Sequence, residues 1–445
     1  MGRKVRIIAG ILITCILTVS GLYYLTGVME KKDSKYKYGP FFAEENDFDV
    51  LFLGTSHVIN GIFPMELWHE YGITSYNLGG HGNTMATTYW TFMNALDYTN
   101  PKVVVLDCYF VSNLNKLNSN IDYMHLSLDA FPMTLKKLRA VNDLFDTRDD
   151  KFDFIWSFGK FHTRWNSLEE NDFVPEYTIE KGAESRVAVA IPNAEGKLAR
   201  EDKAQAEGIG FTYLDKIVQE CEKRGIKIIF TYLPCPADAS MQREANVMYD
   251  IAQTYDIPYI NFLDDSVTHF YTDFYDDTSH LNPSGAKKVT SRLGAYIQEN
   301  CGVEDKRTNS KYASWNEDYN AYAQYKKQLI QEQDDVYSYL MLLADQDIQC
   351  KVYLRKDSDL VENERIISLI ANCSDYDLDF FDRETLPQFY DDNRENNYLK
   401  DMSGAMDIAI IVVDKDTEEI IDISYFYIDP VDDMIKRKWI INEEQ

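Results

Sequence analysis

Metal-ligand clusters and paired cysteines are the clearest absences from this sequence. The 445-residue chain has seven cysteines and seven histidines, but no CxxC pair and no Cys/His cluster at metal-ligand spacing. This disfavours a zinc site, and we expect neither a metal nor a cofactor. The cysteines are too scattered to predict a disulfide scaffold, although one bridge in the later part of the chain stays open.

Positive charge is also scarce. The chain has 45 Lys and Arg residues against 73 Asp and Glu, which gives a formal net charge of −28. A surface of this sign repels phosphate backbones, so we exclude nucleic acid as a sequence-independent partner. No internal repeat or low-complexity tract is evident, and the length and the 45% hydrophobic content predict a sizeable core in two or three domains.

Long apolar runs are absent except at the N-terminus. Ile7–Met29 carries no charge and is long enough to cross a bilayer as a helix. Arg3, Lys4 and Arg6 precede it, and no small-x-small cleavage site follows. Residues 1–29 are therefore predicted to be an uncleaved, single-pass anchor in the cell membrane. The lysines after the apolar segment nearly balance the positive charges before it, so the charges alone do not decide the orientation in the membrane. The short N-terminus favours a cytoplasmic N-terminus and an extracytoplasmic C-terminal part.

Short apolar runs alternate with helical segments from residue 47 to 302, after a predicted linker over residues 30–46. The runs typical of buried strands are Phe48–Leu53, Ser75–Leu78, Val103–Asp107, Ile226–Leu233 and Pro258–Phe262. The expected helices are Pro64–Tyr71, Thr84–Tyr98, Ala204–Arg224, Met241–Tyr255 and Pro283–Glu299. This alternation predicts an α/β domain with a parallel sheet and right-handed crossovers.

The alternation is interrupted and then ends. Residues 110–203 are too long for a plain loop, so we expect an insertion over the strand ends, with a helix near Thr134–Leu144. Residues 303–445 predict a small α+β accessory domain. Its expected elements are one long helix at Tyr319–Leu343, an acidic loop at Asp375–Asp401, and β-like runs at Lys351–Leu354, Arg365–Ala371, Asp407–Val413 and Ile420–Ile428.

A serine follows the first strand, at the edge where open α/β sheets bind ligands. A Gly-Thr-Ser sequence ends this strand and presents Ser56, whose hydroxyl needs a base to become a nucleophile. Asp277 and His280, three residues apart before the last helix of the α/β part, would supply the base and its orienting carboxylate. Asp276 is an adjacent candidate for the carboxylate. Each residue alone is more often a turn or surface residue, and their order along the chain favours catalysis.

A glycine-rich loop, Asn77-Leu-Gly-Gly-His-Gly-Asn-Thr84, follows the second strand. Its glycines allow close backbone approach, and it leads into a helix N-terminus, where N–H groups point outward. The N–H groups of Gly82 and Ser56 are candidate oxyanion donors, and the side-chain amide of Asn83 is a further one.

The order of these segments resembles the SGNH/GDSL hydrolase superfamily over about residues 47–300. Gly54-Thr-Ser56-His57 stands for the first block, with Thr in place of the usual Asp. The Asn77–Thr84 loop stands for the second, with Gly82 at the oxyanion position, and Asp277-Thr-Ser-His280 for the last. The resemblance implies a three-layer, flavodoxin-like fold and a serine esterase or acyltransferase. The third block departs: the family has Gly-x-Asn-Asp, but the strand here ends in Asp107, and an ionised Asp cannot donate.

The same departure and an N-terminal anchor occur in a membrane-anchored branch of the superfamily, which this sequence resembles. That branch is similar to the proteins of teichoic-acid D-alanylation and polysaccharide O-acetylation. That branch implies transfer or removal of acyl groups, acetyl above all, on a cell-surface polysaccharide or other acylated glycan. It also implies a multi-pass acyl-exporting membrane protein as a partner. Esterase and transferase both stay open. So does a different class, a catalytically degenerate SGNH domain that binds glycan or scaffolds an envelope complex, which the missing Asn would favour.

The insertion adds a cluster of polar and aromatic residues. His162, Arg164 and Trp165 combine an imidazole, a cation and an indole, which suits binding of a glycan or an anionic polymer. The alternative for this cluster is a packed structural loop. His81 and His125 are further candidates to line the site, whereas His57, directly after the nucleophile, is expected to make a local structural contact.

Overall fold

A five-stranded parallel sheet is the centre of the largest part of the structure, a computed structural model that describes residues 2–32, 35–112, 116–173, 178–193, 195–276, 280–382 and 406–438. Its strands are β1 (Val50–Leu53), β2 (Ser75–Asn77), β3 (Val103–Asp107), β4 (Lys227–Tyr232) and β5 (Tyr259–Asn261). They pair in the order β2-β1-β3-β4-β5, all parallel. The predicted α/β class and parallel sheet are confirmed. The order reverses between β1 and β3, and ligands of doubly wound folds bind beyond the strand ends at such a point.

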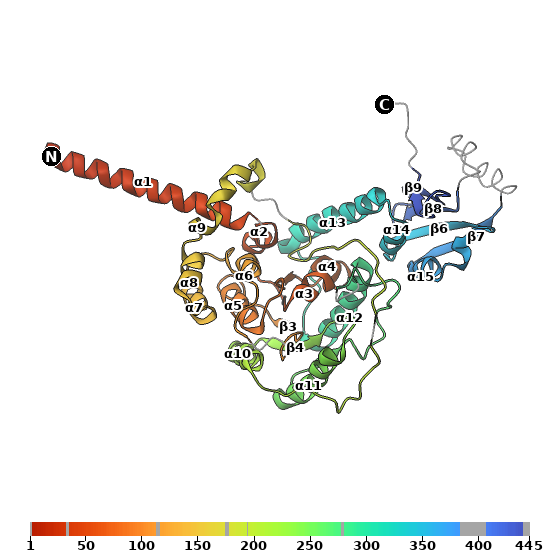
Figure 1. Cartoon of the computed structure of the whole chain (residues 1–445), viewed down its shortest axis with the longest axis horizontal. Helices are drawn as coiled ribbons and strands as arrows, with labels where there is room; N and C mark the ends of the chain where they lie inside the picture. Colours follow the sequence, from red (N-terminus) through yellow and green to blue (C-terminus); the bar gives the residue numbers. More distant parts are fainter. Residues whose placement is uncertain are drawn as a thin grey trace.

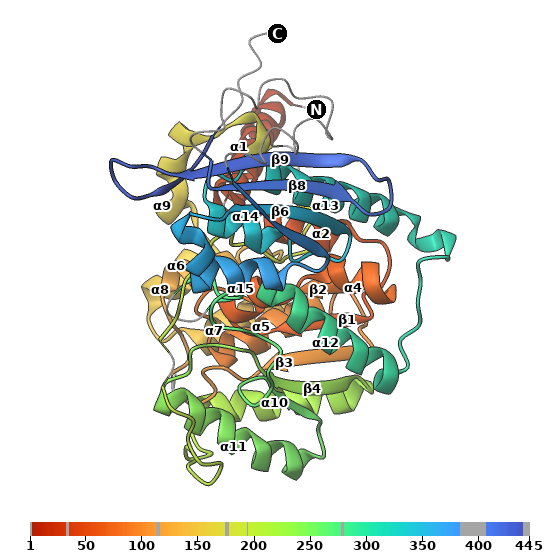
Figure 2. The same ribbon diagram turned by 90° about the vertical axis from the view of Figure 1, so that its right-hand side faces the viewer.

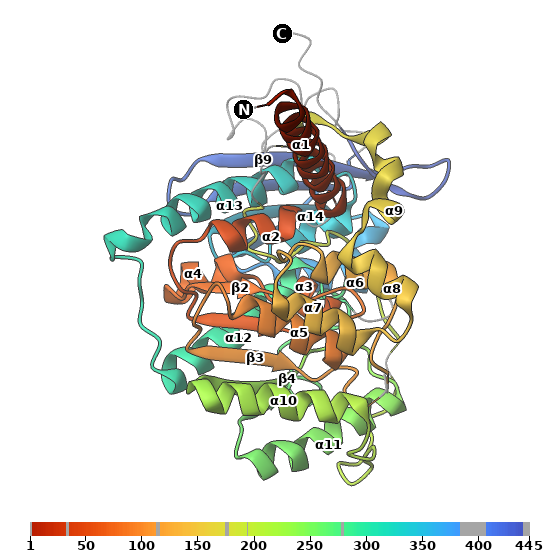
Figure 3. The same ribbon diagram turned by 90° about the vertical axis from the view of Figure 1, so that its left-hand side faces the viewer.

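Helices cover both faces of this sheet, so this part of the chain has three layers (Figures 2 and 3). One face carries α3 (Ser56–Gly61), α4 (Pro64–Tyr71) and α12 (Pro283–Cys301), and the other carries α5 (Met85–Ala95), α10 (Ile209–Arg224) and α11 (Ala239–Tyr255). Along β1, Val50 and Phe52 pack toward the first group, and Leu51 and Leu53 toward the second. Burial on both faces explains why β1 and Val103–Leu106 of β3 are continuous apolar runs rather than alternating ones.

The N-terminal helix α1 (Arg3–Lys31) projects from the α/β part (Figure 1). It is long and apolar enough to cross a membrane, and its apolar window is not buried against the protein. A bilayer is the environment that such an exposed apolar helix suits. The structure therefore agrees with a single-pass anchor at the predicted position.

Part of the predicted linker, residues 30–46, is folded rather than extended. Lys35–Ala43 forms the helix α2, and its Tyr38 and Phe41 are buried in the core of the α/β part. Phe41 stacks on Phe48, just ahead of β1, with ring centroids 5.6 Å apart. The polar composition of the segment concealed two aromatic residues at helical spacing.

The insertion, residues 110–203, contributes several short helices. The predicted helix is present as α7 (Leu135–Leu144), capped by Thr134, whose side chain accepts the N–H of Lys137. The others are α6 (Ile121–Leu128), α8 (Arg148–Ile155), α9 (Phe158–Phe161) and two 3-10 turns, η1 (His162–Ser167) and η2 (Glu170–Asp172). In Figure 1, α7, α8 and α9 lie on the side of the molecule from which α1 projects.

A second, mixed sheet follows in the order β10-β9-β8-β6-β7. Its strands are β6 (Ile348–Arg355), β7 (Tyr376–Phe381), β8 (Ile408–Asp414), β9 (Ile420–Ile428) and β10 (Ile435–Arg437). The helices of this region are α13 (Ala313–Glu332), α14 (Val336–Leu342), α15 (Glu364–Asn372), η3 (Ser310–Tyr312) and η4 (Asp359–Glu362). In Figure 1 this sheet and α1 lie at opposite ends of the molecule.

Three predictions for this region differ from the structure. The long helix at Tyr319–Leu343 is two helices, because Asp335 caps a new one by accepting the N–H of Ser338. The β-like run at Arg365–Ala371 is the helix α15, whose buried Ile366, Leu369 and Ile370 follow helical spacing. The loop at Asp375–Asp401 begins with β7, and its residues from 383 onward lie outside the described residues.

Buried ion pairs join this C-terminal region to the α/β part. The carboxylate of Asp345 lies 2.7 Å from Lys326 and 2.9 Å from Lys287, and Lys326 also lies 3.1 Å from Glu66 of α4. Burial alone would raise the pKa of Asp345, but the two lysines overcome this and hold it below its ordinary value. The cluster couples α4, α12 and α13 through two buried carboxylates, Glu66 and Asp345.

We expect Asp345→Ala to lower the free energy of unfolding by about 3–5 kcal/mol, because two largely buried lysines lose a shared partner. Asp357→Ala is the matched control. Its carboxylate lies 2.8 Å from Arg355 but is 70% exposed, so its loss should cost less than about 1 kcal/mol. Urea unfolding of the two variants measures the difference, and equal losses would contradict the cluster's structural role.

Candidate active site

Ser56 stands where β1 turns into α3. Gly54, directly after the strand, has φ of +151°, and a Cβ at this position would lie 2.9 Å from the Cβ of Asp107. A side chain is therefore excluded here both by conformation and by space. Thr55 caps α3 by accepting the N–H of His57 at 3.2 Å. Ser56 is then the first residue of the helix, half-buried at the carboxyl end of the sheet.

Ser56 meets His280 across 224 residues of sequence. The Oγ of Ser56 lies 2.8 Å from Nε2 of His280. The other ring nitrogen, Nδ1, lies 2.6 Å from Oδ2 of Asp276, and Oδ1 of Asp276 accepts the backbone N–H of His280 at 3.0 Å. His280 and Asp276 are both partly exposed. Hydroxyl, imidazole and carboxylate are thus joined in the sequence of contacts that activates a nucleophilic serine.

The carboxylate in this chain of contacts belongs to Asp276, the alternative candidate. Asp277, the first choice of the sequence analysis, lies outside the described residues. The loop is closed by the N–H of Tyr275, which donates to the carbonyl of His280 at 2.8 Å. Beyond it, Asn282 caps α12 and donates its amide to the carbonyl of Thr272 at 2.9 Å. This closure places Asp276 beside the imidazole that follows it.

The glycine-rich loop after β2 packs on the turn that carries Ser56. The N–H of Gly80 donates to the carbonyl of Gly54 at 3.0 Å. A Cβ on Gly79 would lie 2.7 Å from the carbonyl oxygen of Thr55, so this close approach needs glycine. The side chain of Asn77 donates to the carbonyl of Ile62 at 2.9 Å, beyond the end of α3. The first half of the loop, from Asn77 to Gly80, therefore supports the turn that carries Ser56.

Two predicted oxyanion donors lie in this loop. Gly82 has φ of +57° and faces Tyr123 of α6. The Oδ1 of Asn83 accepts the hydroxyl of Ser127 at 2.9 Å, whereas its Nδ2 is buried and has no hydrogen-bond partner among the described residues. Leaving a buried amide donor unpaired costs about 1–3 kcal/mol. Asn83 therefore holds a buried amide donor that has no partner among the described residues.

His57 lies between His280 and the segment after β3. Its ring stacks on Tyr109 with centroids 3.8 Å apart and meets the His280 ring edge-on at 5.4 Å. Its Nδ1 is buried without a hydrogen-bond partner in the described part of the chain. Burial first, and then the charge of His280, lower the pKa of His57 to about 3. A neutral imidazole with one N–H donor therefore borders His280. The sequence predicts a local structural contact for His57, but its ring partner, Tyr109, is distant in the sequence.

Asp107 occupies the end of β3, where the resembled family has its third block. Its Oδ1 accepts the N–H of Leu233 at 3.0 Å, and its Oδ2 is buried with no hydrogen-bond partner among the described residues. Burial raises the pKa of Asp107 from 3.8 to about 7. The carboxyl group is thus partly protonated at neutral pH, which the sequence analysis, taking it as ionised, did not anticipate.

Asp107 should make the protein less stable as the pH rises. The pKa of Asp107 is about 7 in the folded chain and near 3.8 in the unfolded chain. Its contribution to the free energy of unfolding is therefore fully present below pH 4 and decreases as the pH rises to 7. Between pH 5 and 8, Asp107 is expected to lower the free energy of unfolding by an amount on the order of 2–4 kcal/mol. This decrease should be absent from Asp107→Asn, whose amide does not ionise. Unfolding of both proteins at the two pH values tests this, and an unchanged pH dependence would contradict it.

His81 and His125 have different surroundings. Nε2 of His81, in the glycine-rich loop, lies 3.6 Å from Glu184, and a hydrogen bond from His81 lowers the pKa of Glu184 to about 2. Glu184 itself donates its N–H to the carbonyl of Ile59 in α3 at 3.1 Å, so His81 borders the Ser56 helix. His125 is buried, with Nδ1 2.5 Å from Asp129 and its ring stacked on Phe154.

His162, Arg164 and Trp165 lie in η1, beside the end of α1. Arg164 donates to the carbonyl of Met29 at 2.9 Å and sits over the ring of Phe161 at 4.2 Å. The ring nitrogen Nδ1 of His162 lies 2.8 Å from the carbonyl of Gly159. Trp165 is 68% exposed. The contacts of this cluster run to α1 and α9, and glycan binding by it stays a prediction.

No group of three or more His, Cys, Asp or Glu residues in the described part of the chain is arranged to hold a metal ion. All seven cysteines are free thiols in the structure. Comparison with known proteins adds no assignment, because no protein-family model matches the chain and no curated protein matches it either. The site has to be interpreted from its own geometry.

Proposed function

We propose that this chain is a membrane-anchored serine esterase or O-acyltransferase of the SGNH type. The observation that carries the proposal is the contact chain from Ser56 Oγ to His280 Nε2 at 2.8 Å and from His280 Nδ1 to Asp276 Oδ2 at 2.6 Å. Ser56 follows the end of β1, and Asp276 and His280 lie in the loop before α12, at the edge of an open α/β sheet where ligands bind. A turn with only a structural role does not require a hydroxyl, an imidazole and a carboxylate in successive contact.

The chemistry follows from the three groups. Ser56 Oγ attacks the ester carbonyl while its proton moves to His280 Nε2, and Asp276 stabilises the imidazolium through Nδ1–H. The oxyanion forms beside the N–H of Ser56, which as the first N–H of α3 has no intrahelical acceptor, and beside Gly82, Asn83 and His57. The alcohol then leaves with the proton from His280. Water or a sugar hydroxyl, deprotonated by the same nitrogen, releases the acyl group from Ser56.

The acyl group is proposed to be acetyl on a cell-surface polysaccharide. The anchor α1 would hold the site on the outer face of the membrane, next to polymer and to a multi-pass protein that exports acyl groups. The acidic surface, with its net charge of −28, favours a neutral glycan over an anionic one. An esterase and a transferase differ here only in which hydroxyl reaches the acyl-enzyme.

The full chain in lipid nanodiscs, given p-nitrophenyl acetate, tests the proposal. We expect release of p-nitrophenol, and mass spectrometry of added oligosaccharides would separate transfer from hydrolysis. A folded chain that binds oligosaccharide but releases no p-nitrophenol would contradict the enzyme and support the degenerate, glycan-binding alternative.

Protease digestion of the C-terminal region in intact cells is expected under the proposed topology, and digestion only after lysis would contradict it.

His57→Phe should lower kcat by about 10²–10³ with little change in KM, because an N–H near the oxyanion is lost while the ring on Tyr109 is kept. His57→Asn supplies an amide donor and should recover part of the rate. Steady-state kinetics with the activated ester measure both variants. A normal rate in His57→Phe would show that the imidazole only fills space.

A further inference from the structure

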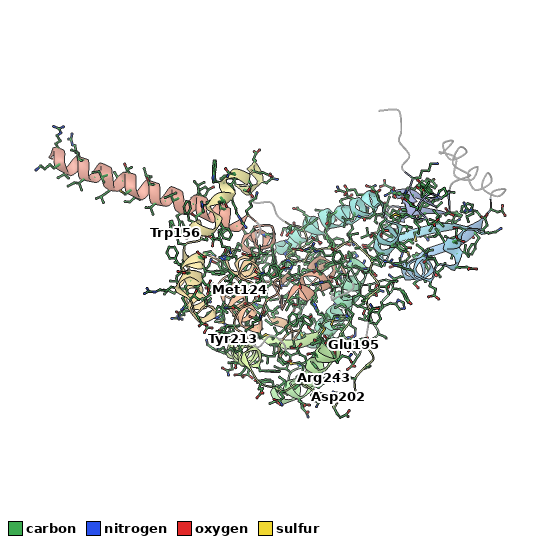
Figure 4. All side chains as sticks on the ribbon, in the orientation of Figure 1. Met124, Trp156, Glu195, Asp202, Tyr213 and Arg243 are labelled. Atoms are coloured by element: carbon green, nitrogen blue, oxygen red, sulfur yellow. The ribbon has the colours of Figure 1, made fainter. Side chains whose placement is uncertain are left out.

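A cavity of about 490 Å³ lies where α1 leaves the folded part of the chain. One wall is the last turns of α1, with Tyr23, Tyr24 and Gly27. The opposite walls come from α2, the loop after α6 and the end of α8, and they include Phe42, Phe131, Pro132, Met133, Ile155 and Trp156. Figure 4 shows Trp156 on the side of the molecule that carries α1. The volume and the apolar lining are those of a ligand site, not of a packing defect.

The surroundings of the cavity mark the level of the membrane surface. Tyr23 and Tyr24 lie near the end of the exposed apolar stretch of α1, at the place where interfacial aromatic residues are expected. Large apolar side chains are also exposed in the insertion, whose helices α7, α8 and α9 lie on the side of the molecule from which α1 projects (Figure 1), and they are Leu135, Leu138, Phe152, Ile155, Trp165 and Phe173. Such a patch beside a membrane helix is expected to rest on the bilayer. With α1 across a bilayer, we expect the cavity to open at the height of the lipid headgroups.

Three acids, Glu30, Asp129 and Asp172, and two lysines, Lys31 and Lys137, line the cavity, and Lys137 and Asp172 have ion-pair partners within the protein. Lys137 lies 3.6 Å from Glu30 and donates to the carbonyl of Phe131 at 2.9 Å. Lys32 lies 2.6 Å from Asp172. With acids at least as numerous as bases in the wall, an anionic headgroup gains little here. The cavity offers apolar contact rather than a phosphate site.

We infer that this cavity binds the hydrocarbon tail of a lipid from the outer leaflet, entering between α1 and the insertion. The tail would fix the height and tilt of the domain on the membrane, since α1 is already tied to the insertion by Arg164 and Lys32. This site is separate from Ser56, and its test does not depend on esterase activity.

Photocrosslinking in nanodiscs tests the inference. The full chain is placed in phosphatidylcholine that carries a diazirine at the end of one acyl chain, and adducts are located by mass spectrometry. We expect adducts on Phe131, Met133 or Trp156, and none there when the diazirine is on the headgroup. Adducts confined to the exposed stretch of α1, or equal labelling of the cavity by both probes, would overturn the inference.

A matched pair of glycine variants sharpens the result. Gly27 lines the cavity, and a Cβ there meets no atom within 4 Å, so Gly27→Phe can fill the space without a clash. Gly21 has the same free surroundings but is not in the cavity wall, so Gly21→Phe is the control. We expect Gly27→Phe to reduce cavity adducts roughly tenfold and Gly21→Phe to leave them unchanged. Equal labelling of the two variants, both with the unfolding temperature of the unchanged chain, would contradict a tail in this cavity.

Discussion

Ser56→Ala is expected to reduce ester turnover by about 10⁴-fold or more, to the level of the uncatalysed reaction plus binding effects. The Oγ of Ser56 is the atom in contact with the base, and alanine removes it without altering the cap at Thr55 or the φ of Gly54. The fold should therefore be unchanged. The measurement is the initial rate of p-nitrophenol release by the full chain in nanodiscs.

Thr55→Ser is the control for this variant. It keeps the hydroxyl that accepts the N–H of His57, so α3 keeps its cap and the rate should stay within about threefold. A Ser56→Ala protein that retains its rate would mean that another residue, or a contaminating hydrolase, attacks the ester.

Asp276→Asn is expected to lower kcat on the order of 10³–10⁴-fold with a small change in KM. An amide cannot stabilise the His280 imidazolium, and it can hold the wrong tautomer by donating to Nδ1. The matched control is Asp277→Asn, which removes one charge from the same loop without touching the carboxylate found at 2.6 Å from the ring. We expect its rate to change less than about tenfold.

The two Asp variants decide between the candidates that the sequence left open. Kinetics over pH 5 to 9 measure both, since loss of the orienting carboxylate should also change the pH profile of kcat/KM. The reverse ranking, with Asp277→Asn inactive and Asp276→Asn active, would assign the role to Asp277 and contradict the geometry described here.

Strand–helix rhythm was enough to predict the α/β class, because β1, β3 and β4 are buried on both faces and stand out as apolar runs. Ser56 is a candidate because it follows a strand end, and His280 because it comes just before the last helix of the α/β part. The choice between Asp276 and Asp277 could not be made from spacing, since it depends on how the Tyr275 N–H closes the loop on His280.

Long-range packing accounts for what the sequence concealed. The stack of His57 on Tyr109 joins two segments that follow different strands, and no local pattern marks it. Glu244 of α11 holds the segment after β3 by accepting the N–H groups of Phe110 and Ser112, at 3.1 and 2.5 Å. Nothing near Glu244 in the sequence signals that role. In the C-terminal region, a short apolar run at α15 fits a strand or a helix until its packing is known.

Covalent labelling of Ser56 tests the account most directly. The full chain in nanodiscs is treated with a fluorophosphonate probe, and the modified peptide is identified by mass spectrometry. A serine activated by His280 should form one adduct, on Ser56, which is absent from Ser56→Ala and strongly reduced in Asp276→Asn. No adduct on a folded chain, or an adduct on a different residue, would contradict the assignment of Ser56 as the nucleophile.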